Sequence, residues 1–361
     1  MRKKLIGLAV AGVLTAPLTV YAQGSNVQIY GLMQPSIDFV DNGDDDGHFM
    51  QDNNSRLGFK GTEDLGGGLK AIFQLESRLR FDERGDEGGF VNRDSWVGLA
   101  GGFGSVTVGN HQSAYVRSTA ALDPFADSIG DYNNIMSVYG VGLFDFNDRF
   151  RNSIYYTSPS FGGVQILASY ALRSEGFEDD DDPDAIDPDD DNTYSIAASW
   201  TMGAFGLIAA YERQQGDVND PWAAKLGASF KLLPTTTIYA MVDRLDTDTD
   251  ADERWGGYIG AKHSMGNIDL LANVMYAKGT DGGFVLDDEA VPPVVLGDDD
   301  GALAFSLGAA YNFSKRTQIG AFYTRVDNDD DGVYGIDSGG YEPSEPGETV
   351  QAISVRVRHS F

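Results

Sequence analysis

Charged side chains that recur at regular intervals are the residues of this sequence best suited to act on a ligand. Three carboxylates, Asp123, Asp127 and Asp131, follow one another at a spacing of four. Basic residues recur at spacings of two or four in several other stretches. The basic set comprises Arg56, Lys60, Arg78, Arg80, Arg93, Arg149 and Arg151. Rows of opposite charge create an electric field across an aqueous site, and low-dielectric walls strengthen that field.

A second group of acidic residues resembles the start of a calcium loop. Asp327, Asp329, Asp331 and Gly332 fit the pattern D-x-D-x-D-G, but the twelfth position is Ser338 instead of glutamate. The complete motif therefore fails. A solvated acidic loop is the simpler interpretation. Loosely bound Ca²⁺ or Mg²⁺ is the alternative.

Catalytic chemistry has little support in the sequence. The histidines are His48, His111, His263 and His359. Lipase chemistry needs a Ser–His pair that a third group orients, and no such arrangement is evident. We therefore expect no enzyme activity and no cofactor.

The first 22 residues have the features of a secretory signal. Arg2, Lys3 and Lys4 precede an apolar stretch that Gly7, Gly12 and Pro17 interrupt, and small residues end at Ala22. This pattern predicts a signal peptide over residues 1–22 and a mature domain over residues 23–361. A membrane anchor is the alternative, but the stretch is short for one.

Composition restricts the possible partners. The chain carries a formal net charge of −29 and no cysteine. Such acidity argues against nucleic acid as a partner. The absence of cysteine in an exported chain argues against a small disulfide-stapled domain.

Most of the remaining chain alternates between apolar and polar residues with a period of two. The stretch from Trp222 to Lys231 is one example, and the stretch from Leu303 to Phe313 is another. Such alternation places one face of a strand in an apolar medium and the other in a polar one. A β-sandwich and a membrane β-barrel both satisfy this pattern.

The connections between these strands separate the two possibilities. Short connections alternate strictly with long or acidic ones, and fifteen connections join sixteen strands. The short ones lie near 64–68, 101–104, 159–163, 202–204, 233–235, 266–267 and 314–315, and the long ones at 41–52, 82–92, 113–150, 175–192, 216–221, 247–254, 279–300 and 327–349. Short turns on one rim, long loops on the other and an even strand number are typical of an outer-membrane barrel. We therefore predict an all-β fold, a transmembrane antiparallel barrel of sixteen strands around an aqueous channel.

The segment 113–150 differs from the other long connections. It contains Tyr115, Phe125, Ile129, Tyr132 and Met136 among other apolar residues, whereas the others are rich in Asp and Gly. A loop this rich in apolar residues is expected to pack against other residues. It can do so inside the barrel or on itself as a surface Ω-loop.

Several motifs resemble the Gram-negative general porin family of trimeric, sixteen-stranded outer-membrane channels. They are NVQIYG near residue 26, SRLGFKGTEDLGGGLKAIFQLE at 55–76, WVGLAGGFGSVTVGN at 96–110, NSIYYTSPSFGGVQ at 152–165 and the terminal RHSF. The chain departs from the family where Asn110 and Tyr155 stand at positions that are often basic. The resemblance spans the mature chain.

The resemblance implies where the charged residues act. The third long loop, 113–150, would fold into the lumen with Asp123, Asp127 and Asp131. The basic set would face it from the wall and so complete the constriction. Phe361 would be the aromatic C-terminal signal that the barrel assembly machinery reads.

The resemblance also implies a function. We expect a homotrimer in the outer membrane of a Gram-negative bacterium, in contact with lipopolysaccharide and membrane lipid, that lets small hydrophilic solutes and ions diffuse passively. The acidity of the chain predicts a weak cation preference. A substrate-specific channel of the same fold is the main alternative, and a purely structural barrel is a more distant one.

Overall fold

The computed structural model describes residues 26–80, 91–139, 144–172, 192–215, 220–248, 253–279, 284–287, 294–296 and 299–361. The expected signal peptide lies outside the described residues. Most of the acidic segments 82–92 and 175–192 lies outside them as well.

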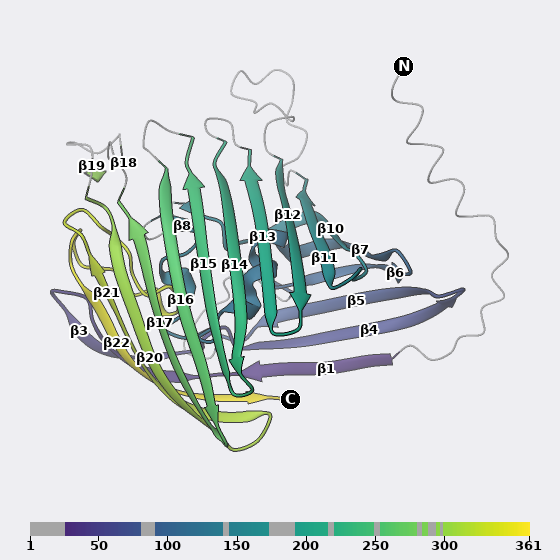
Figure 1. The fold of residues 1–361 in the computed structure, drawn as a ribbon, viewed down its shortest axis with the longest axis horizontal. Helices are drawn as coiled ribbons and strands as arrows, with labels where there is room; N and C mark the ends of the chain where they lie inside the picture. The colour runs from purple at the N-terminus through teal and green to yellow at the C-terminus, as the bar shows by residue number, and fades with distance from the viewer. Residues whose placement is uncertain are drawn as a thin grey trace.

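The described strands form one closed antiparallel sheet and two small hairpins (Figure 1). The sheet contains β1 (Asn26–Met33), β2 (Ser36–Asp41), β3 (Asp46–Gln51), β4 (Arg56–Gly66), β5 (Leu69–Arg78), β6 (Ser95–Gly101), β7 (Gly104–Gln112), β10 (Arg149–Thr157), β11 (Val164–Ala171), β12 (Thr193–Met202), β13 (Phe205–Gln214), β14 (Trp222–Leu233), β15 (Thr236–Asp246), β16 (Arg254–Met265), β17 (Ile268–Lys278), β20 (Ala302–Asn312), β21 (Thr317–Asn328) and β22 (Val350–Ser360). The hairpins are β8 (Val138–Tyr139) with β9 (Phe144–Asp145), and β18 (Phe284–Asp287) with β19 (Val294–Leu296). Short helices are α2 (Ala114–Thr119), η1 (Ala120–Leu122), η2 (Tyr132–Asn134) and η3 (Asp337–Gly339).

The sheet closes as a barrel of sixteen strands, as predicted. β1 and β2 together make one wall strand, and β3 and β4 make the next, so the eighteen segments correspond to sixteen crossings. The last strand, β22, pairs with both β1 and β2 and removes the free edges. Every other wall strand pairs with its neighbour in sequence.

The break between β1 and β2 falls at Gln34 and Pro35. Proline has no backbone N–H to donate to the ladder, which explains why the strand is interrupted here. The carbonyl of Pro35 still accepts a hydrogen bond from the backbone N–H of Val357 at 3.0 Å. The barrel is therefore closed on both sides of the break.

The first connection differs from the prediction. Residues 41–52 were expected to form a long loop, but β2 and β3 join through a tight turn in which Asn42 N–H donates to the Asp45 carbonyl at 3.1 Å. The acidic and glycine residues there form a turn because Asp41 and Asn42 side chains accept backbone N–H bonds. The irregular backbone lies at 52–55, where Asn53 and Asn54 adopt φ angles of 44° and 64°.

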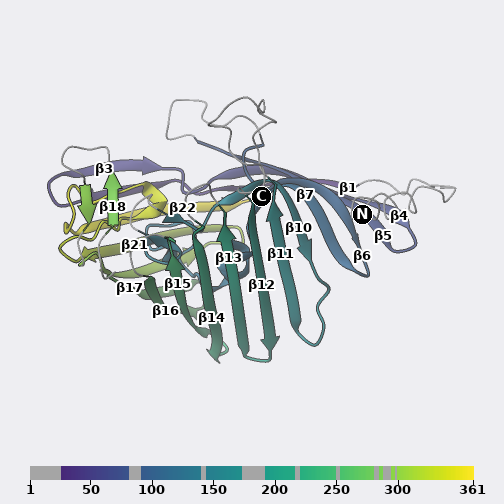
Figure 2. The ribbon, with the colours of Figure 1, turned by 90° about the horizontal axis from the view of Figure 1, so that it is seen from above.

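The two rims of the barrel differ in their connections. All seven expected short turns are present and lie on what is called here the short-turn rim. The opposite end is the long-loop rim. Figure 1 shows the short turns below the strands β12–β17. Figure 2, seen from above, shows the wall curving around the interior.

The outer face of the wall is apolar. Leu226 and Ile259 are 61% and 65% exposed, whereas Lys225 and Tyr258, next to them in sequence, are 2% exposed on the inner face. Aromatic pairs lie near both rims. The rings of Phe205 and Phe230 stack 4.6 Å apart near the short turns, and those of Tyr211 and Trp222 stack 6.0 Å apart near the long-loop rim. An apolar band with aromatic residues at its edges is the surface that a lipid bilayer requires.

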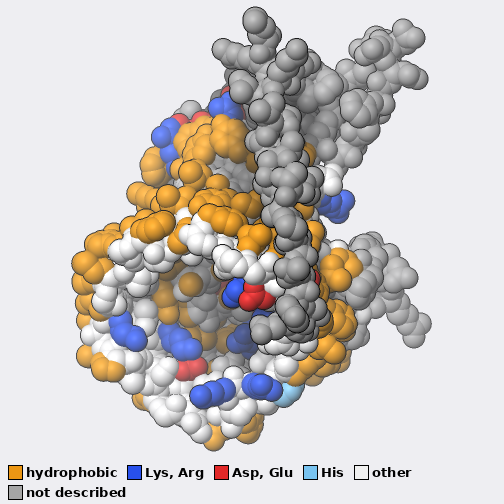
Figure 3. All heavy atoms as spheres, turned by 90° about the vertical axis from the view of Figure 1, so that its right-hand side faces the viewer, with side chains coloured by type: hydrophobic (Ala, Val, Ile, Leu, Met, Phe, Trp, Pro, Cys, Tyr) orange, Lys and Arg blue, Asp and Glu red, His pale blue; other side chains and the backbone are white. Residues whose placement is uncertain are grey.

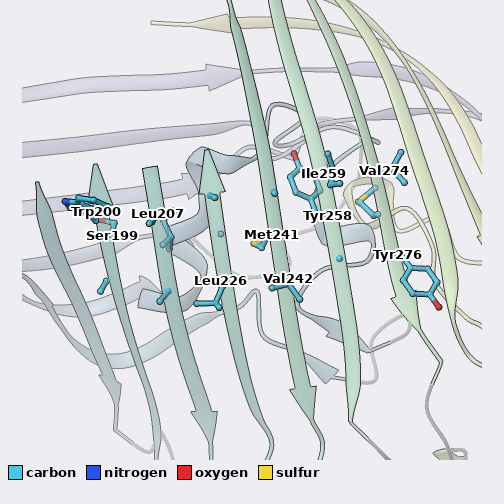
Figure 4. Close-up of a pocket in the computed structure, with 18 of the residues that line it drawn as sticks. Ser199, Trp200, Leu207, Leu226, Met241, Val242, Tyr258, Ile259, Val274 and Tyr276 are labelled. Atoms are coloured by element: carbon cyan, nitrogen blue, oxygen red, sulfur yellow. The ribbon is translucent and has the colours of Figure 1, made fainter. Parts of the chain in front are cut away.

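A hollow of about 860 Å³ lies on the wall across β12 to β17. Figure 4 shows Leu226, Val242, Ile259 and Val274 around it, between Trp200 and Tyr276. Leu226, Val242, Ile259 and Val274 are exposed, and most of the other residues that line the hollow are also apolar. The hollow therefore belongs to the apolar outer surface. Among the described residues, helices are too short or too polar to cross a membrane.

Candidate functional site

The segment that follows β7 crosses the interior of the barrel. Ser113 caps helix α2, because its Oγ accepts the N–H of Val116 at 3.2 Å. The helix begins against the inner wall: the N–H groups of Ala114 and Tyr115 donate to Ser169 Oγ and Ser195 Oγ at 3.1 and 2.7 Å. These serines lie on β11 and β12, so the chain leaves the wall strand and turns directly into the lumen.

The middle of the segment stays on the inner wall. Tyr258 Oη of β16 donates to the Leu122 carbonyl at 3.1 Å, and Asn273 Nδ2 of β17 donates to the Gly130 carbonyl at 2.7 Å. These bonds satisfy carbonyls of a backbone that has no ladder of its own. The loop is therefore held by side chains of the wall.

Apolar packing supports the same placement. The rings of Phe125 and Phe322 meet edge to face at 6.1 Å, and those of Tyr132 and Tyr258 at 5.9 Å. Phe125, Ile129, Ile135 and Met136 are fully buried. The prediction that 113–150 folds into the lumen is confirmed, and the Ω-loop alternative is wrong.

A buried ion pair fixes the returning half of the loop. Arg254 Nη1 lies 3.0 Å from Asp243 Oδ1, and both side chains are almost fully buried. Asp243 Oδ2 accepts the N–H of Ser137 at 2.5 Å, and Arg254 Nη2 donates to the carbonyl of Ile135. The two wall residues thus bind two backbone groups of the loop.

A second buried cation lies beside this pair. Lys225 of β14 stands opposite Asp243 in the ladder, and its Nζ lies 3.6 Å from the centre of the Tyr115 ring. A cation over an aromatic face is attracted by the ring quadrupole. Lys225 therefore holds the start of the loop, as Arg254 holds its end.

The tip of the loop reaches the opposite wall through Asp127. Its carboxylate lies 3.3 Å from Arg56 Nη1 and accepts a hydrogen bond from Asn54 Nδ2 at 3.1 Å. Its carbonyl accepts a bond from Arg356 Nη1 at 2.6 Å. Asp127 has φ of 56°, a conformation that Asp tolerates better than most residues. The loop thus spans the lumen as far as β4 and β22.

Asp123 and Asp131 have a different role from the one expected. The carboxylate of Asp123 accepts the N–H groups of Phe125 and Tyr132, at 2.8 and 3.2 Å. That of Asp131 accepts those of Asn133 and Asp127, at 3.0 and 2.9 Å. Both carboxylates shape the loop instead of facing the arginines, because turns without a ladder need side-chain acceptors.

Burial changes the titration of these two loop carboxylates. It raises the pKa of Asp123 to about 6, although the two backbone N–H bonds oppose the shift. Burial, and then the charge of Asp123, also raises the pKa of Asp131. The protons of two such neighbours are therefore lost in coupled steps that belong to the pair.

Three of the predicted wall arginines lie beside carboxylates of the wall itself. Arg78 pairs with Asp52 at 3.0 Å, Arg93 with Glu76 at 2.8 Å and Arg149 with Asp94 at 3.0 Å. The Arg78 side chain is 32% exposed, whereas that of Asp52 is 1% exposed, and Arg149 is likewise more exposed than Asp94. The lumen therefore meets guanidinium groups in front of carboxylates.

The remaining basic residues of the predicted set lie elsewhere. Lys60 is exposed and stands over the Tyr30 ring, 5.1 Å from its centre. Arg80 lies just beyond the end of β5. Arg151 is exposed at the bulge between Phe150 and Ser153. Lys60 therefore lies on the short-turn side of Arg56, whereas Arg80 and Arg151 lie at the long-loop ends of their strands.

Sequence reasoning missed several residues of this site. Asn54 and Arg117 were not predicted, yet Asn54 bridges Arg93 and Asp127, and Arg117 Nη1 lies 4.0 Å from Asp94. The Asn53–Asn54 pair was the available signal, because asparagine is enriched at positive φ. Arg356 was visible as an inward residue of the last strand but was not assigned to the loop.

The last long loop was also misjudged. Residues 327–349 were interpreted as a solvated acidic loop, but Tyr334 and Ile336 are buried in the same core as Phe125 and Met136. Tyr341 Oη donates to Asp38 Oδ2 of the inner wall at 3.1 Å, and Asp337 N–H donates to Asn134 Oδ1 at 2.9 Å. Its aromatic residues, like those of 113–150, indicate packing inside the barrel mouth.

The candidate calcium residues do not converge. Asp327 binds Arg325 Nε at 2.9 Å and accepts a bond from Thr349 Oγ1 at 2.9 Å. Asp329 is exposed, and Asp331 N–H donates to the Asp299 carbonyl. Among the described residues there is no group of three or more His, Cys, Asp or Glu suited to hold a metal ion.

The C-terminal residue seals the barrel. Phe361 exchanges two backbone hydrogen bonds of 3.1 Å with Gly31 of β1. Its ring covers Gly31, where a Cβ atom would lie 2.2 Å from Cζ of Phe361. The ring is 45% exposed on the outer face, near the short-turn rim.

The sequence and the fold match known channels. A family model described as Gram-negative porin matches residues 7–331. Outer membrane porin protein 32 of Delftia acidovorans is 28% identical over 379 residues, with all of both chains covered. A monosaccharide porin of Halomonas is 25% identical over 367 residues, covering 92% of this chain and 98% of its own.

Two solved structures show the same architecture. The anion-selective porin from Comamonas acidovorans aligns with a TM-score of 0.77 and 25% identity, over 94% of this chain and 100% of that one. The trimer form of Vibrio cholerae OmpT aligns with a TM-score of 0.65 and 13% identity, over 94% and 100%. The family model covers nine-tenths of the chain, and the barrel has the fold of these two structures. The chain therefore belongs to the Gram-negative porin family, and it is an outer-membrane channel and not an enzyme.

Proposed function

We propose that the chain forms a water-filled channel through which small hydrophilic solutes and ions diffuse passively, and that it requires no cofactor. The observation that carries the proposal is the loop 113–150, which crosses the lumen and meets Arg56 through Asp127. A loop fixed at both ends and at its tip defines the size of the remaining opening. Charges on the two sides of that opening align water and dipolar solutes.

The ion preference depends on two opposing sets of charge. The net charge of −29 favours cations at long range. The exposed guanidinium groups of Arg56, Arg78, Arg117 and Arg149 favour anions at the constriction itself. We therefore propose a weak cation preference at low ionic strength that declines as salt is raised, because the Debye length falls from about 30 Å at 0.01 M to about 3 Å at 1 M.

The reversal potential in a KCl gradient tests this proposal. The permeability ratio of K⁺ to Cl⁻ should exceed one when the mean concentration is about 0.01 M, and it should approach or fall below one near 1 M. A cation preference that stays constant or grows with salt would contradict it. Conductance without any saturable block by sugars, nucleosides or phosphate would support general diffusion.

A substrate-specific channel is the second candidate, and the relative named as a monosaccharide porin favours it. Tyr341, Asn133 and Glu342 line a cavity of about 260 Å³ between the two inward loops. A channel with a sugar site would show current block that saturates with monosaccharide concentration. A general pore would show a small block that rises linearly.

The partners follow from the family and are proposals for this chain. A trimer is supported by the trimer form of OmpT, which shares the fold. We propose that the barrel assembly machinery reads Phe361, the aromatic residue that follows β22, in the unfolded chain. Contact with lipopolysaccharide at the long-loop rim, and loosely bound Ca²⁺ or Mg²⁺ there, stay predictions.

A further inference from the structure

Cations line the inner wall between the loop 113–150 and the short-turn rim. Alternation along each strand identifies them, because residues an even number apart share a face. Arg56, Lys225 and Arg356 each contact the inward loop 113–150, so their side chains lie on the inner face of the wall. Lys60, Lys231 and Arg358 lie an even number of residues from them on the same strands and therefore share that inner face. Lys262 shares the inner face with Arg254 in the same way.

These four residues, Lys60, Lys231, Lys262 and Arg358, are called here the lower cation ring. Lys60, Lys231 and Arg358 are exposed to the lumen, and Lys262 is half-exposed. A carboxylate meets one of them, since Asp269 lies 3.0 Å from Lys262 Nζ. Figure 3, which views the molecule from the right-hand side of Figure 1, shows the hollow of the barrel with Lys and Arg side chains around it and fewer Asp and Glu.

The opposite end carries the opposite charge. Exposed carboxylates cluster on the β2–β3 turn, before β20 and in the last long loop. Among the described residues they are Asp44, Asp45, Asp46, Asp299, Asp329, Asp330, Asp337, Glu342, Glu345 and Glu348.

The described cations near this rim, which include Arg80 and Arg151 at the long-loop ends of β5 and β10, are fewer than these carboxylates. Arg213, Arg244 and Arg325 lie on the outer face, and each already pairs with an acidic residue. The rim that a solute enters from the long-loop side is therefore acidic in its described part.

We infer that the channel is electrically polarised along its axis and rectifies ion current. The inference rests on the proposed channel function. Fixed carboxylates at the long-loop rim concentrate mobile cations there, and the lower cation ring concentrates mobile anions below the constriction. A positive potential on the long-loop side drives both kinds of ion toward the constriction and raises its conductance. The reverse potential depletes the constriction and lowers the conductance.

The size of the effect follows from screening. At 0.01 M salt the Debye length is about 30 Å, comparable with the height of a bilayer, so the two charged zones act over the whole pore. We expect a current ratio of about 2 between equal and opposite voltages under those conditions. At 1 M salt, with a Debye length of about 3 Å, the ratio should fall to about 1.

Single-channel recording from the intact protein in planar bilayers tests the inference. The orientation of each channel must be known, and the absence of native cysteine allows this. Thr235→Cys lies on the exposed β14–β15 turn, where biotin can be attached. Streptavidin added to one chamber then alters the current only if the short-turn rim faces that chamber. The larger current should flow whenever the opposite, long-loop side is positive.

Paired variants separate the lower cation ring from charge in general. Lys231→Gln with Arg358→Gln removes two inward cations and should bring the low-salt ratio close to 1. Lys315→Gln with Arg316→Gln removes two cations from the exposed β20–β21 turn at the same rim, and this control should keep most of the asymmetry.

The possible outcomes distinguish the inference from the function beneath it. Conductance that is symmetric at low salt would overturn the polarised channel and leave the channel function intact. An asymmetry of opposite sign, or one that both double variants abolish equally, would also overturn the inference. Absence of conductance would overturn the proposed function itself.

Discussion

At the constriction, the exposure of a charged group decides its effect on a passing ion. Asp127 and Arg56 have side chains exposed by 23% and 25%, so both contact the aqueous path. Asp52 is nearly buried behind Arg78 and contributes mainly by orienting it. Asp52 and Asp127 carry the same charge, but Asp127 should affect ion selectivity more because its carboxylate contacts the aqueous path.

Asp127→Asn should shift the permeability ratio of K⁺ to Cl⁻ toward Cl⁻ by about twofold. A unit charge about 8 Å from an ion in water contributes about 0.5 kcal/mol, which is a factor of about two. Reversal potentials at equal mean salt measure the shift. Asp44→Asn removes the same charge from the exposed β2–β3 turn and should change the ratio less. Equal shifts in both variants would show that Asp127 has no special position.

Lower pH should move the ion preference in the same direction. Burial raises the pKa of Asp123 to about 6 and raises that of Asp131, so between pH 7.5 and 5 the loop gains protons and loses negative charge. Because the pKa of Asp123 is higher in the folded than in the unfolded state, protonation of Asp123 stabilises the fold. This contribution to the free energy of unfolding is complete below the ordinary pKa of 3.8 and is lost as the pH rises through about 6. Reversal potentials from pH 7.5 to 5 measure the change of preference. Asp123→Asn should reduce this pH dependence, and an undiminished dependence would assign it to other groups.

At the scale of elements, the loop 113–150 depends on a few buried wall residues. Asp243 and Arg254 bind the backbone of Ser137 and Ile135. Asp243→Asn leaves Arg254 without its counter-charge, and breaking a buried pair in this way costs about 3–5 kcal/mol. Single-channel traces should show more current noise as the loop detaches. Asp246→Asn is the control, because Asp246 lies three residues along β15 and is only partly buried. Its single-channel traces should show no added current noise.

The last long loop should narrow the mouth together with 113–150. Gly347 N–H donates to the Gly332 carbonyl at 2.9 Å, so residues 333–346 can be replaced by a two-residue linker with little strain at the ends. Removal of Tyr334, Ile336 and Tyr341 uncovers the third loop and should raise the single-channel conductance. An unchanged conductance in a correctly folded barrel would mean that the loop lies outside the ion path.

More of the fold than of the candidate site could be predicted from the sequence. Period-two alternation and the sorting of connections by length fix strand number and direction, because each wall strand has one lipid face and one water face. The site depends instead on contacts between residues far apart in the sequence, such as Asp127 with Arg56. Spacing placed three aspartates on one loop, but only the folded backbone determines that two of them bind N–H groups of that loop.

At the scale of the whole molecule, barrel closure should give unusual resistance to detergent. All wall hydrogen bonds are made between neighbouring strands, and β22 pairs with β1 and β2, so no edge is available for unfolding to begin. Unheated protein should migrate on SDS gels as a compact trimer, and boiled protein as a slower, unfolded monomer. Migration as a monomer before heating would contradict the trimer and leave the barrel unaffected.

The most direct test of the central claim is the size of the opening that 113–150 leaves. Single-channel conductance should be measured in a graded series of neutral polymers, for the wild type and for a variant in which residues 116–146 are replaced by a short linker. The wild-type channel should exclude polymers that the shortened variant admits, and the variant should conduct more. Equal conductance and an equal exclusion limit would contradict the claim that this loop sets the width of the channel.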